Sequence, residues 1–224
     1  MRNYIVAAVG DWNKEIFVQK KITLEGEWHY VDTPEALDRK LEYIKPKYIF
    51  FIHWRWIVGD NILSDFECVC FHMTDVPYGR GGSPLQNLIV KGHTETVLTA
   101  LRMEKTLDTG PVYYKMPLSL LGSAHSIYKR ATQLSWKMIL KFVIEVPVPE
   151  NQNGEPVIFK RRKPEDGELL SDFSPEKAYD YIRMLDAPGY PPAFIDYGNL
   201  RLEFDNAELH DGEVTASVKI RIKV

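Results

Sequence analysis

An apolar run that stops at a histidine constrains the fold of this 224-residue chain more than any other feature. The run is Cys68–Phe71, and His72 ends it. Residues 73–84 then form a segment rich in Gly and Pro, too polar and too broken for a strand or a helix. The sequence therefore predicts a buried strand with His72 at its carboxyl end.

A helix and a second strand are predicted next. Pro84 stands where a first helical turn accepts proline, and Leu85, Leu88 and Ile89 have the spacing of one helix face. Gly92 ends this helix, and residues 96–103 predict a strand that leads into the turn 107–110 with Asp108. Two strands thus each finish in a titratable side chain beside a Gly-containing turn. Sites form at the carboxyl edge of open α/β sheets, so we expect His72 and Asp108 there.

The first half of the chain repeats the order strand, helix, strand. Residues 4–9 and 48–53 predict strands, and Thr33 with Pro34 predicts the start of an amphipathic helix that Pro46 ends. This order predicts an α/β fold, a mainly parallel Rossmann-like sheet with helices on both faces. A complete G-x-G-x-x-G is absent after the first strand, so the dinucleotide-binding interpretation is weak.

The second half predicts a boundary and a small appendage. Residues 123–143 form a long amphipathic helix that closes a first domain, 1–150, and prolines between 147 and 156 mark a linker. Ser174 and Pro175 predict a further helix start. Residues 200–204 and 214–224 alternate apolar and polar side chains, as half-exposed strands do. Residues 151–224 are therefore predicted to hold the linker, a helix and a small C-terminal β-rich subdomain.

Charge and hydropathy exclude some partners. The net charge of -3 argues against binding a polyanion by general electrostatics, so we expect no nucleic acid partner. The first apolar run is too short for a signal peptide, and no later run approaches the ~20 apolar residues of a membrane span. We expect a cytoplasmic protein without a membrane partner.

The chain has two cysteines, Cys68 and Cys70. They are too close together for a sensible disulfide, and no His or Cys companions stand at the spacing of a zinc site. The prediction is two reduced structural thiols and no metal.

Four pieces of this pattern, in order, carry a family resemblance. They are the strand, His72, Pro77-Tyr-Gly-Arg-Gly-Gly-Ser-Pro84 before a helix, and Leu107-Asp-Thr-Gly110. Together they resemble the folate-dependent formyltransferases, which include methionyl-tRNA formyltransferase, glycinamide ribonucleotide transformylase and the sugar N-formyltransferases. The catalytic set of that family is Asn-x-His plus the Asp of the later turn. His72 and Asp108 match it, whereas Cys70 stands at the Asn position.

The resemblance implies that residues 1–150 are a formyltransferase catalytic domain using N10-formyltetrahydrofolate as formyl donor, with no metal. Formyl transfer to an amine creates an oxyanion that must be stabilised and an ammonium proton that must be removed. His72 would supply the hydrogen-bond donor. Asp108 would hold the imidazole in the right protonation state and relay the proton.

The resemblance also implies binding residues. The loop after the second strand is expected to wall the folate pocket, and the alternative is that the two tryptophans there serve packing or partner contact. The folate-binding candidates are Trp54, Arg55, Trp56, Ile57, Val58 and Leu107. The substrate-binding candidates are Gly10, Trp12, Asn13, Tyr78, Gly79, Arg80, Gly81, Lys160 and Arg161. The basic run 160–163 is either a clamp for a substrate diphosphate or a solvated turn.

The chain length falls between those of the glycinamide ribonucleotide and tRNA enzymes, which favours a nucleotide-linked amino sugar, UDP or dTDP, as substrate. Its product would enter bacterial surface glycan or glycoprotein synthesis. Aminoacyl-tRNA or another amine remains an alternative substrate. Because Cys70 replaces the Asn of the family, a catalytically inactive folate- or nucleotide-binding module is a further alternative. The sequence is also compatible with a homodimer.

The departure at Cys70 raises its own question. Alternate residues of a strand share a face, so Cys70 is expected beside His72, and a thiol donates a much weaker hydrogen bond than an amide. His53 ends the neighbouring predicted strand and is a candidate catalytic residue that could replace the lost donor. The alternative is that His53 only caps its strand.

Overall fold

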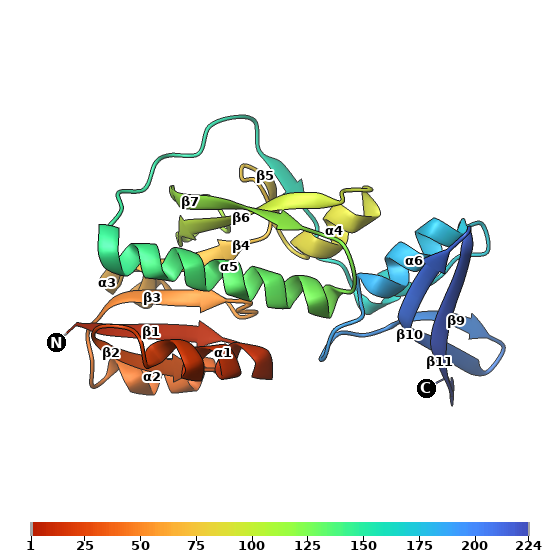
Figure 1. Ribbon diagram of the computed structural model, residues 1–224, viewed down its shortest axis with the longest axis horizontal. Coiled ribbons are helices and arrows are strands. Elements are labelled where there is room, and N and C mark those ends of the chain that lie inside the picture. Colours follow the sequence, from red (N-terminus) through yellow and green to blue (C-terminus); the bar gives the residue numbers. More distant parts are fainter. Residues whose placement is uncertain (1, 224) are drawn as a thin grey trace. The chain divides into compact units, whose positions relative to one another are not determined.

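The computed structural model describes residues 2–223 and is built on a six-stranded sheet (Figure 1). The strand order is β2-β1-β3-β4-β6-β7. Its strands are β1 (Asn3–Ala8), β2 (Glu27–Val31), β3 (Pro46–Ile52), β4 (Cys68–His72), β6 (Glu95–Arg102) and β7 (Val112–Ser119).

Within the six-stranded sheet, parallel strand pairs predominate among β1, β2, β3, β4 and β6. β1 runs parallel to β2 and β3, and β3 runs parallel to β4. β6, in contrast, is antiparallel to β4, with Val69 opposite Arg102 and His72 opposite Thr99. The carboxyl ends of β4 and β6 therefore lie at opposite edges, and the expectation that both ends meet at one edge is wrong. Strand direction depends on long-range pairing, which the apolar pattern of β6 does not encode.

Helices cover both faces of the sheet, as predicted. They are α1 (Asp11–Lys21), α2 (Pro34–Leu41), α3 (Asp60–Asp65) and α5 (Ala124–Glu145), whereas α4 (Pro84–Val90) follows the loop after β4. On one face Phe51 packs in a cluster with Leu37 of α2 and Ile62 of α3. On the other face Phe50 meets Phe142 of α5, with 5.3 Å between ring centroids. Successive strand residues point to opposite faces, so β3 is buried on both sides.

The predicted helix starts are confirmed. The Thr33 side chain accepts a hydrogen bond from the Ala36 amide at 3.1 Å, with Pro34 at the first helical position. One feature of the loop 73–84 differs from the expectation. It contains a short strand, β5 (Tyr78–Gly81), which pairs with β8 (Val157–Phe159), because a partner strand far along the chain supplies the hydrogen bonds.

The C-terminal segment forms a separate antiparallel sheet of order β11-β10-β9, which confirms the predicted β-rich appendage. Its elements are the 3-10 helix η1 (Pro164–Gly167), α6 (Pro175–Arg183), β9 (Ala193–Tyr197), β10 (Leu200–His210) and β11 (Glu213–Ile222). Apolar and charged residues alternate along β10 and β11. Facing pairs are Leu202 with Ile220 and Glu203 with Lys219.

The chain divides into two compact units that interleave in sequence. One comprises Met1–Arg80, Val97–Leu118 and Lys129–Ile158, and the other comprises Gly81–Thr96, Ser119–Tyr128 and Phe159–Val224. The predicted domain boundary at residue 150 stays a prediction. Within residues 2–223, no helix has both the length and the apolar character needed to cross a membrane.

Candidate active site

His72 and Asp108 lie side by side although they come from different parts of the fold. The His72 Nδ1 atom is 3.5 Å from Asp108 Oδ1, and His72 is 8% exposed. The other ring nitrogen, Nε2, is 2.8 Å from the carbonyl oxygen of Gly79. Because a carbonyl only accepts hydrogen bonds, Nε2 carries a hydrogen and donates it to Gly79. Nδ1 is thus the ring nitrogen that faces Asp108.

Asp108 reaches His72 through a loop that turns back after β6. The loop begins where the Met103 amide donates to the Cys68 carbonyl at 2.8 Å. It returns to the strand where the Arg102 amide donates to the Pro111 carbonyl at 2.9 Å. Asp108 itself has a φ of 56°, in the left-handed region that few residues other than glycine adopt. Gly110 packs so closely that a Cβ there would overlap the Arg102 carbonyl oxygen.

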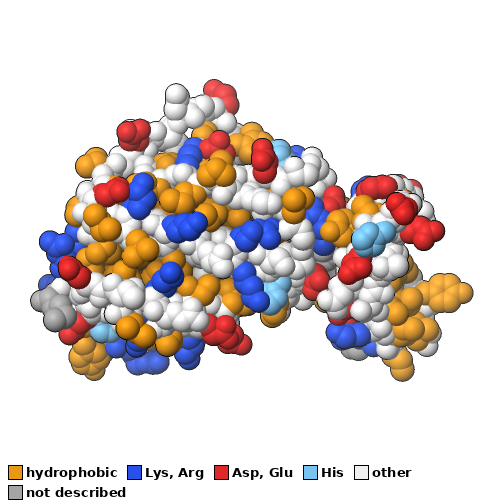
Figure 2. All heavy atoms as spheres, in the orientation of Figure 1, with side chains coloured by type: hydrophobic (Ala, Val, Ile, Leu, Met, Phe, Trp, Pro, Cys, Tyr) orange, Lys and Arg blue, Asp and Glu red, His pale blue; other side chains and the backbone are white. Residues whose placement is uncertain are grey.

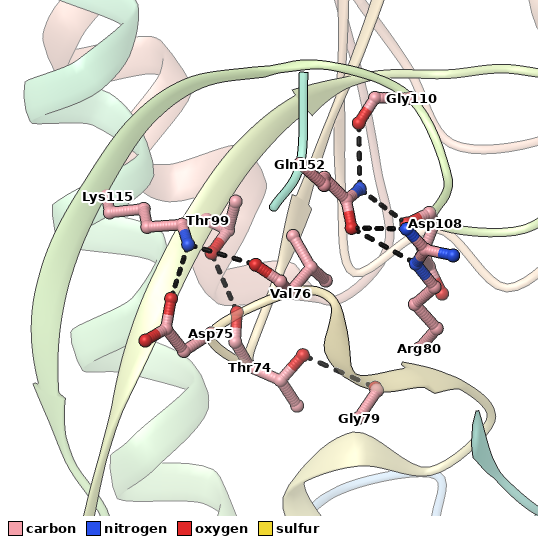
Figure 3. A network of polar contacts seen from close by, with 10 residues as sticks. All are labelled: Thr74, Asp75, Val76, Gly79, Arg80, Thr99, Asp108, Gly110, Lys115 and Gln152. Atoms are coloured by element: carbon pink, nitrogen blue, oxygen red, sulfur yellow. Dashed lines mark hydrogen bonds and ion pairs between the residues drawn. The ribbon is translucent and has the colours of Figure 1, made fainter. Parts of the chain in front are cut away.

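Buried hydroxyl groups hold the loop that follows β4 (Figure 3). The Thr99 hydroxyl donates to the Thr74 carbonyl at 2.7 Å, and the Thr74 hydroxyl donates to the Gly79 carbonyl at 3.3 Å. From β7, Lys115 forms an ion pair with Asp75 and donates to the Val76 carbonyl at 3.0 Å. The carbonyl that orients His72 is therefore part of a supported network.

Gln152, from the segment after α5, joins Arg80 to the Asp108 loop (Figure 3). Its Oε1 atom accepts from Arg80 Nε at 3.0 Å and from Nη2 at 2.8 Å. Its Nε2 atom donates to the carbonyl oxygens of Asp108 and Gly110, both at 2.8 Å.

Cys70 lies on the face of the sheet that packs against α2 and α3. Burial raises the pKa of its thiol well above the ordinary value, and the charge of Asp108 raises it further. The thiol therefore stays protonated at neutral pH. As a weak donor it cannot supply the hydrogen bond that an Asn side chain would give.

His53 is held from the other face of the sheet. Its Nε2 atom is 3.2 Å from the Thr132 hydroxyl on α5, which donates to Asn13 Oδ1 at 2.8 Å. The Asn13 Nδ2 atom donates to the Val9 carbonyl, which fixes the orientation of that amide. Since the single hydroxyl hydrogen of Thr132 goes to Asn13, the bond from His53 requires a hydrogen on Nε2. In a neutral ring Nδ1 is then an acceptor.

The loop 53–58 combines anchored and exposed apolar side chains. Trp54 packs against Phe51 and against Trp56, with ring centroids 5.6 Å and 4.8 Å apart. Val58 is buried, whereas Trp56, Ile57 and Leu107 are exposed, and the Arg55 guanidinium lies over the Trp56 ring. The exposed members are apolar surfaces on which a flat ring could pack.

The loop after β1 is built around Trp12. A Cβ at Gly10, whose φ is 98°, would overlap the Trp12 ring, so this position requires glycine. Asn13 is 1% exposed and both ends of its amide are bonded, so it supports the loop from within.

The basic run lies beside part of the motif loop, within the second compact unit. Gly82 packs directly on Arg161, the Lys160 carbonyl accepts from Asn87 at 2.9 Å, and the Arg162 amide donates to Ser83 Oγ at 3.0 Å. In the first unit, Tyr78 precedes Gly79 on β5 and is partly exposed. Gly81 adopts a φ of 103°.

Sequence reasoning missed the residues that hold the site together. These are Thr74, Thr99, Lys115, Thr132 and Gln152. The Thr74 hydroxyl bonds the nearby Gly79 carbonyl, whereas each of the other four acts through a partner at least 25 residues away in the sequence. Gln152 stands in a linker without periodicity, where no local pattern distinguishes it.

Comparisons with known proteins place this arrangement in a family. A solved structure of methionyl-tRNA formyltransferase from Clostridium thermocellum is 43% identical, covers 100% of both chains and has a TM-score of 0.96. The chain belongs to the folate-dependent formyltransferase family. Residues 164–221 match the family model described as the methionyl-tRNA formyltransferase C-terminal domain.

Other relatives differ in coverage. A methionyl-tRNA formyltransferase from Francisella tularensis subsp. novicida is 29% identical over 63% of this chain, which spans 46% of that relative. A likely sugar N-formyltransferase from Mycobacterium tuberculosis shares the fold, with a TM-score of 0.71, 14% identity and coverage of 97% and 96% of the two chains. HypX from Aquifex aeolicus, solved with tetrahydrofolic acid, has a TM-score of 0.73 at 14% identity and covers 95% of this chain and 40% of its own.

Proposed function

We propose that this protein transfers a formyl group from N10-formyltetrahydrofolate to the primary amine of a nucleotide-linked amino sugar. The observation that carries the reaction is the pair of buried His72 and partly buried Asp108, 3.5 Å apart. A hydrogen-bond donor beside a carboxylate suits an oxyanion and an ammonium proton that develop together.

In this mechanism the neutral amine attacks the formyl carbon, and the new C–N bond pushes charge onto the formyl oxygen. His72 donates to that oxygen from Nδ1, while its Nε2–H stays bonded to the Gly79 carbonyl. Asp108 takes the ammonium proton. The proton passes to N10 of the departing tetrahydrofolate as the old C–N bond breaks, so the protein ends unchanged.

Folate as the donor is supported by family membership and by the loop 53–58. Trp54 and Val58 anchor the loop, and Trp56, Ile57 and Leu107 keep exposed apolar surface for the pterin ring. Apolar side chains with a few backbone polar groups are typical of sites for flat ligands. HypX, which shares this fold, was solved with tetrahydrofolic acid.

Charge supports the proposed substrate class. Between residues 164 and 221, the segment that matches the tRNA enzyme's C-terminal model, the sequence has thirteen acidic and five basic residues. Binding a nucleic acid depends on neutralising phosphates, and an acidic segment repels them. On the face drawn in Figure 2, acidic and basic side chains are interspersed. A small nucleotide with one or two phosphates, met by Arg80 or by the basic run at Lys160 and Arg161, fits this charge better than tRNA does.

Aminoacyl-tRNA is the second candidate substrate. The similarity to methionyl-tRNA formyltransferase from Clostridium thermocellum and the match to the C-terminal family model favour it. For either substrate we propose a cytoplasmic location, where both reactants would be available. A role in bacterial glycan synthesis and a homodimer remain predictions.

The test is incubation with N10-formyltetrahydrofolate and either a panel of UDP- and dTDP-linked amino sugars or methionyl-tRNA. Mass spectrometry of each acceptor detects the added formyl group. Turnover on a sugar nucleotide, unaffected by excess methionyl-tRNA, is expected. Turnover only on methionyl-tRNA would replace the substrate assignment, and folate binding without turnover on any amine would overturn the reaction.

A further inference from the structure

Gln152 uses every hydrogen-bonding group of its amide to join two parts of the site. A primary amide has two hydrogens to donate and an oxygen with two lone pairs. Here the oxygen accepts twice from Arg80, and the two hydrogens go to the carbonyls of Asp108 and Gly110. No other natural side chain except Asn offers this combination, and Asn is one methylene shorter.

The bonds from Gln152 act on a backbone that needs support. Asp108 has a positive φ of 56°, which costs free energy for a residue with a Cβ. Its carbonyl bond to Gln152 stabilises this conformation, and the conformation directs the carboxylate toward His72 at 3.5 Å. Gly110 is pressed against β6 on its other side. The loop is therefore held between the sheet and Gln152.

Gln152 also holds Arg80 without neutralising it. The amide is uncharged, and among residues 2–223 no carboxylate lies within ion-pair distance of the Arg80 guanidinium. A Glu at position 152 would accept the same two bonds but would cancel the charge and lose both donors. The amide thus preserves a positive charge beside the Asp108 loop, where an anionic substrate group would meet it.

We propose that Gln152 is a positioning residue for formyl transfer, which sets the Asp108 carboxylate against His72 and fixes Arg80 as an unneutralised cation. This inference rests on the proposed function for its kinetic consequence. Its structural consequence, a tethered loop, can be tested without any turnover.

The experiment compares Gln152→Leu and Gln152→Glu with two matched controls, Asn153→Leu and Asn153→Asp. Asn153 is exposed and adjacent, so its variants make the same chemical changes away from the tether. We expect both Gln152 variants to lower kcat roughly 10- to 100-fold, since a misplacement of about 1 Å can cost that much. The KM for the folate donor should change less than threefold. The Asn153 variants should behave as the wild type.

A double-mutant cycle tests whether Gln152 acts through Asp108. In an Asp108→Asn background, Gln152→Leu should reduce kcat by less than threefold, because the carboxylate it positions is already gone. Additive losses, or a normal kcat in Gln152→Leu, would overturn the proposal.

Hydrogen exchange separates this proposal from the proposed function. Amides of residues 103–111 should exchange at least tenfold faster in Gln152→Leu than in Asn153→Leu, even if no amine is formylated. Equal exchange rates in the two variants would show that the tether does not hold the loop, whatever the reaction.

Discussion

At the scale of single residues, the two ring nitrogens of His72 have different partners: Nε2 bonds Gly79, and Nδ1 faces Asp108. The role of this pair in turnover can be tested by substitution. We expect His72→Asn and Asp108→Asn each to lower kcat by about 10² to 10⁴, the usual cost of losing an oxyanion donor or an acid–base partner. Circular dichroism and thermal unfolding serve as the control for folding. Near-normal turnover in either folded variant would remove that residue from the mechanism.

For His53, the structure predicts which ring nitrogen bears the hydrogen. The chain of bonds through Thr132 and Asn13 puts its hydrogen on Nε2, so ¹⁵N NMR of the free protein should show the Nε2–H tautomer. That hydrogen is bonded to Thr132, so it does not replace the missing Asn donor, and we propose that His53, with its ring fixed by this bond, supports the transfer step. His53→Ala should lower kcat at least tenfold more than it alters KM, whereas Cys70→Ser should change kcat little.

The comparison of these two variants decides between the roles. A crippled Cys70→Ser with a normal His53→Ala would assign the working position to the thiol. An Nδ1–H tautomer would restore the donor role for His53.

At the scale of elements, the loop between β6 and β7 depends on one close approach. A Cβ at Gly110 would overlap the Arg102 carbonyl, which is rigid backbone. Gly110→Ala should therefore displace the Asp108 loop, cost about 1–3 kcal/mol of unfolding free energy and lower kcat at least tenfold. Denaturant unfolding and steady-state kinetics measure the two effects.

Gly59→Ala is the matched control for this substitution. Its backbone has an ordinary φ of -66°, and a Cβ there would meet only the flexible end of the Asn61 side chain. If both variants retained wild-type stability and activity, the close packing of the Asp108 loop against β6 would not matter.

At the scale of the whole molecule, the two cysteines make stability depend on pH. Burial raises the pKa of Cys68 to about 12 and that of Cys70 well above the ordinary value of 9.0. As pH rises above 9.0, the thiols of the unfolded chain lose protons while those of the folded chain keep them. The folded state then binds more protons, so stability falls with rising pH by up to about 1.4 kcal/mol per pH unit for each thiol.

The measurement is unfolding by urea at several values between pH 8 and 10. Burial also raises the pKa of several tyrosines, which lower the stability of both proteins toward the upper end of this interval. A variant with Cys68→Ala and Cys70→Ala should lose less stability over this interval than the wild type does. Parallel curves for the two proteins would contradict the assignment of raised pKa values to the thiols.

Local physical chemistry explains what the sequence alone determined. The Thr33 cap, the proline starts of α2, α4 and α6, and the apolar runs of β3 and β4 depend on neighbours within a few residues, so their patterns predicted the elements correctly. The ordered motif also singled out His72 and Asp108, which the structure brings within 3.5 Å.

Only the tertiary structure decided how these residues meet. β6 runs antiparallel to β4, so Asp108 arrives by a returning loop and not at the end of a parallel strand. Gln152 lies 44 residues from Asp108 and 72 from Arg80, and Thr132 lies 79 from His53. Such hydrogen bonds form only when distant segments pack together, so local sequence patterns such as periodicity or helix caps do not predict them.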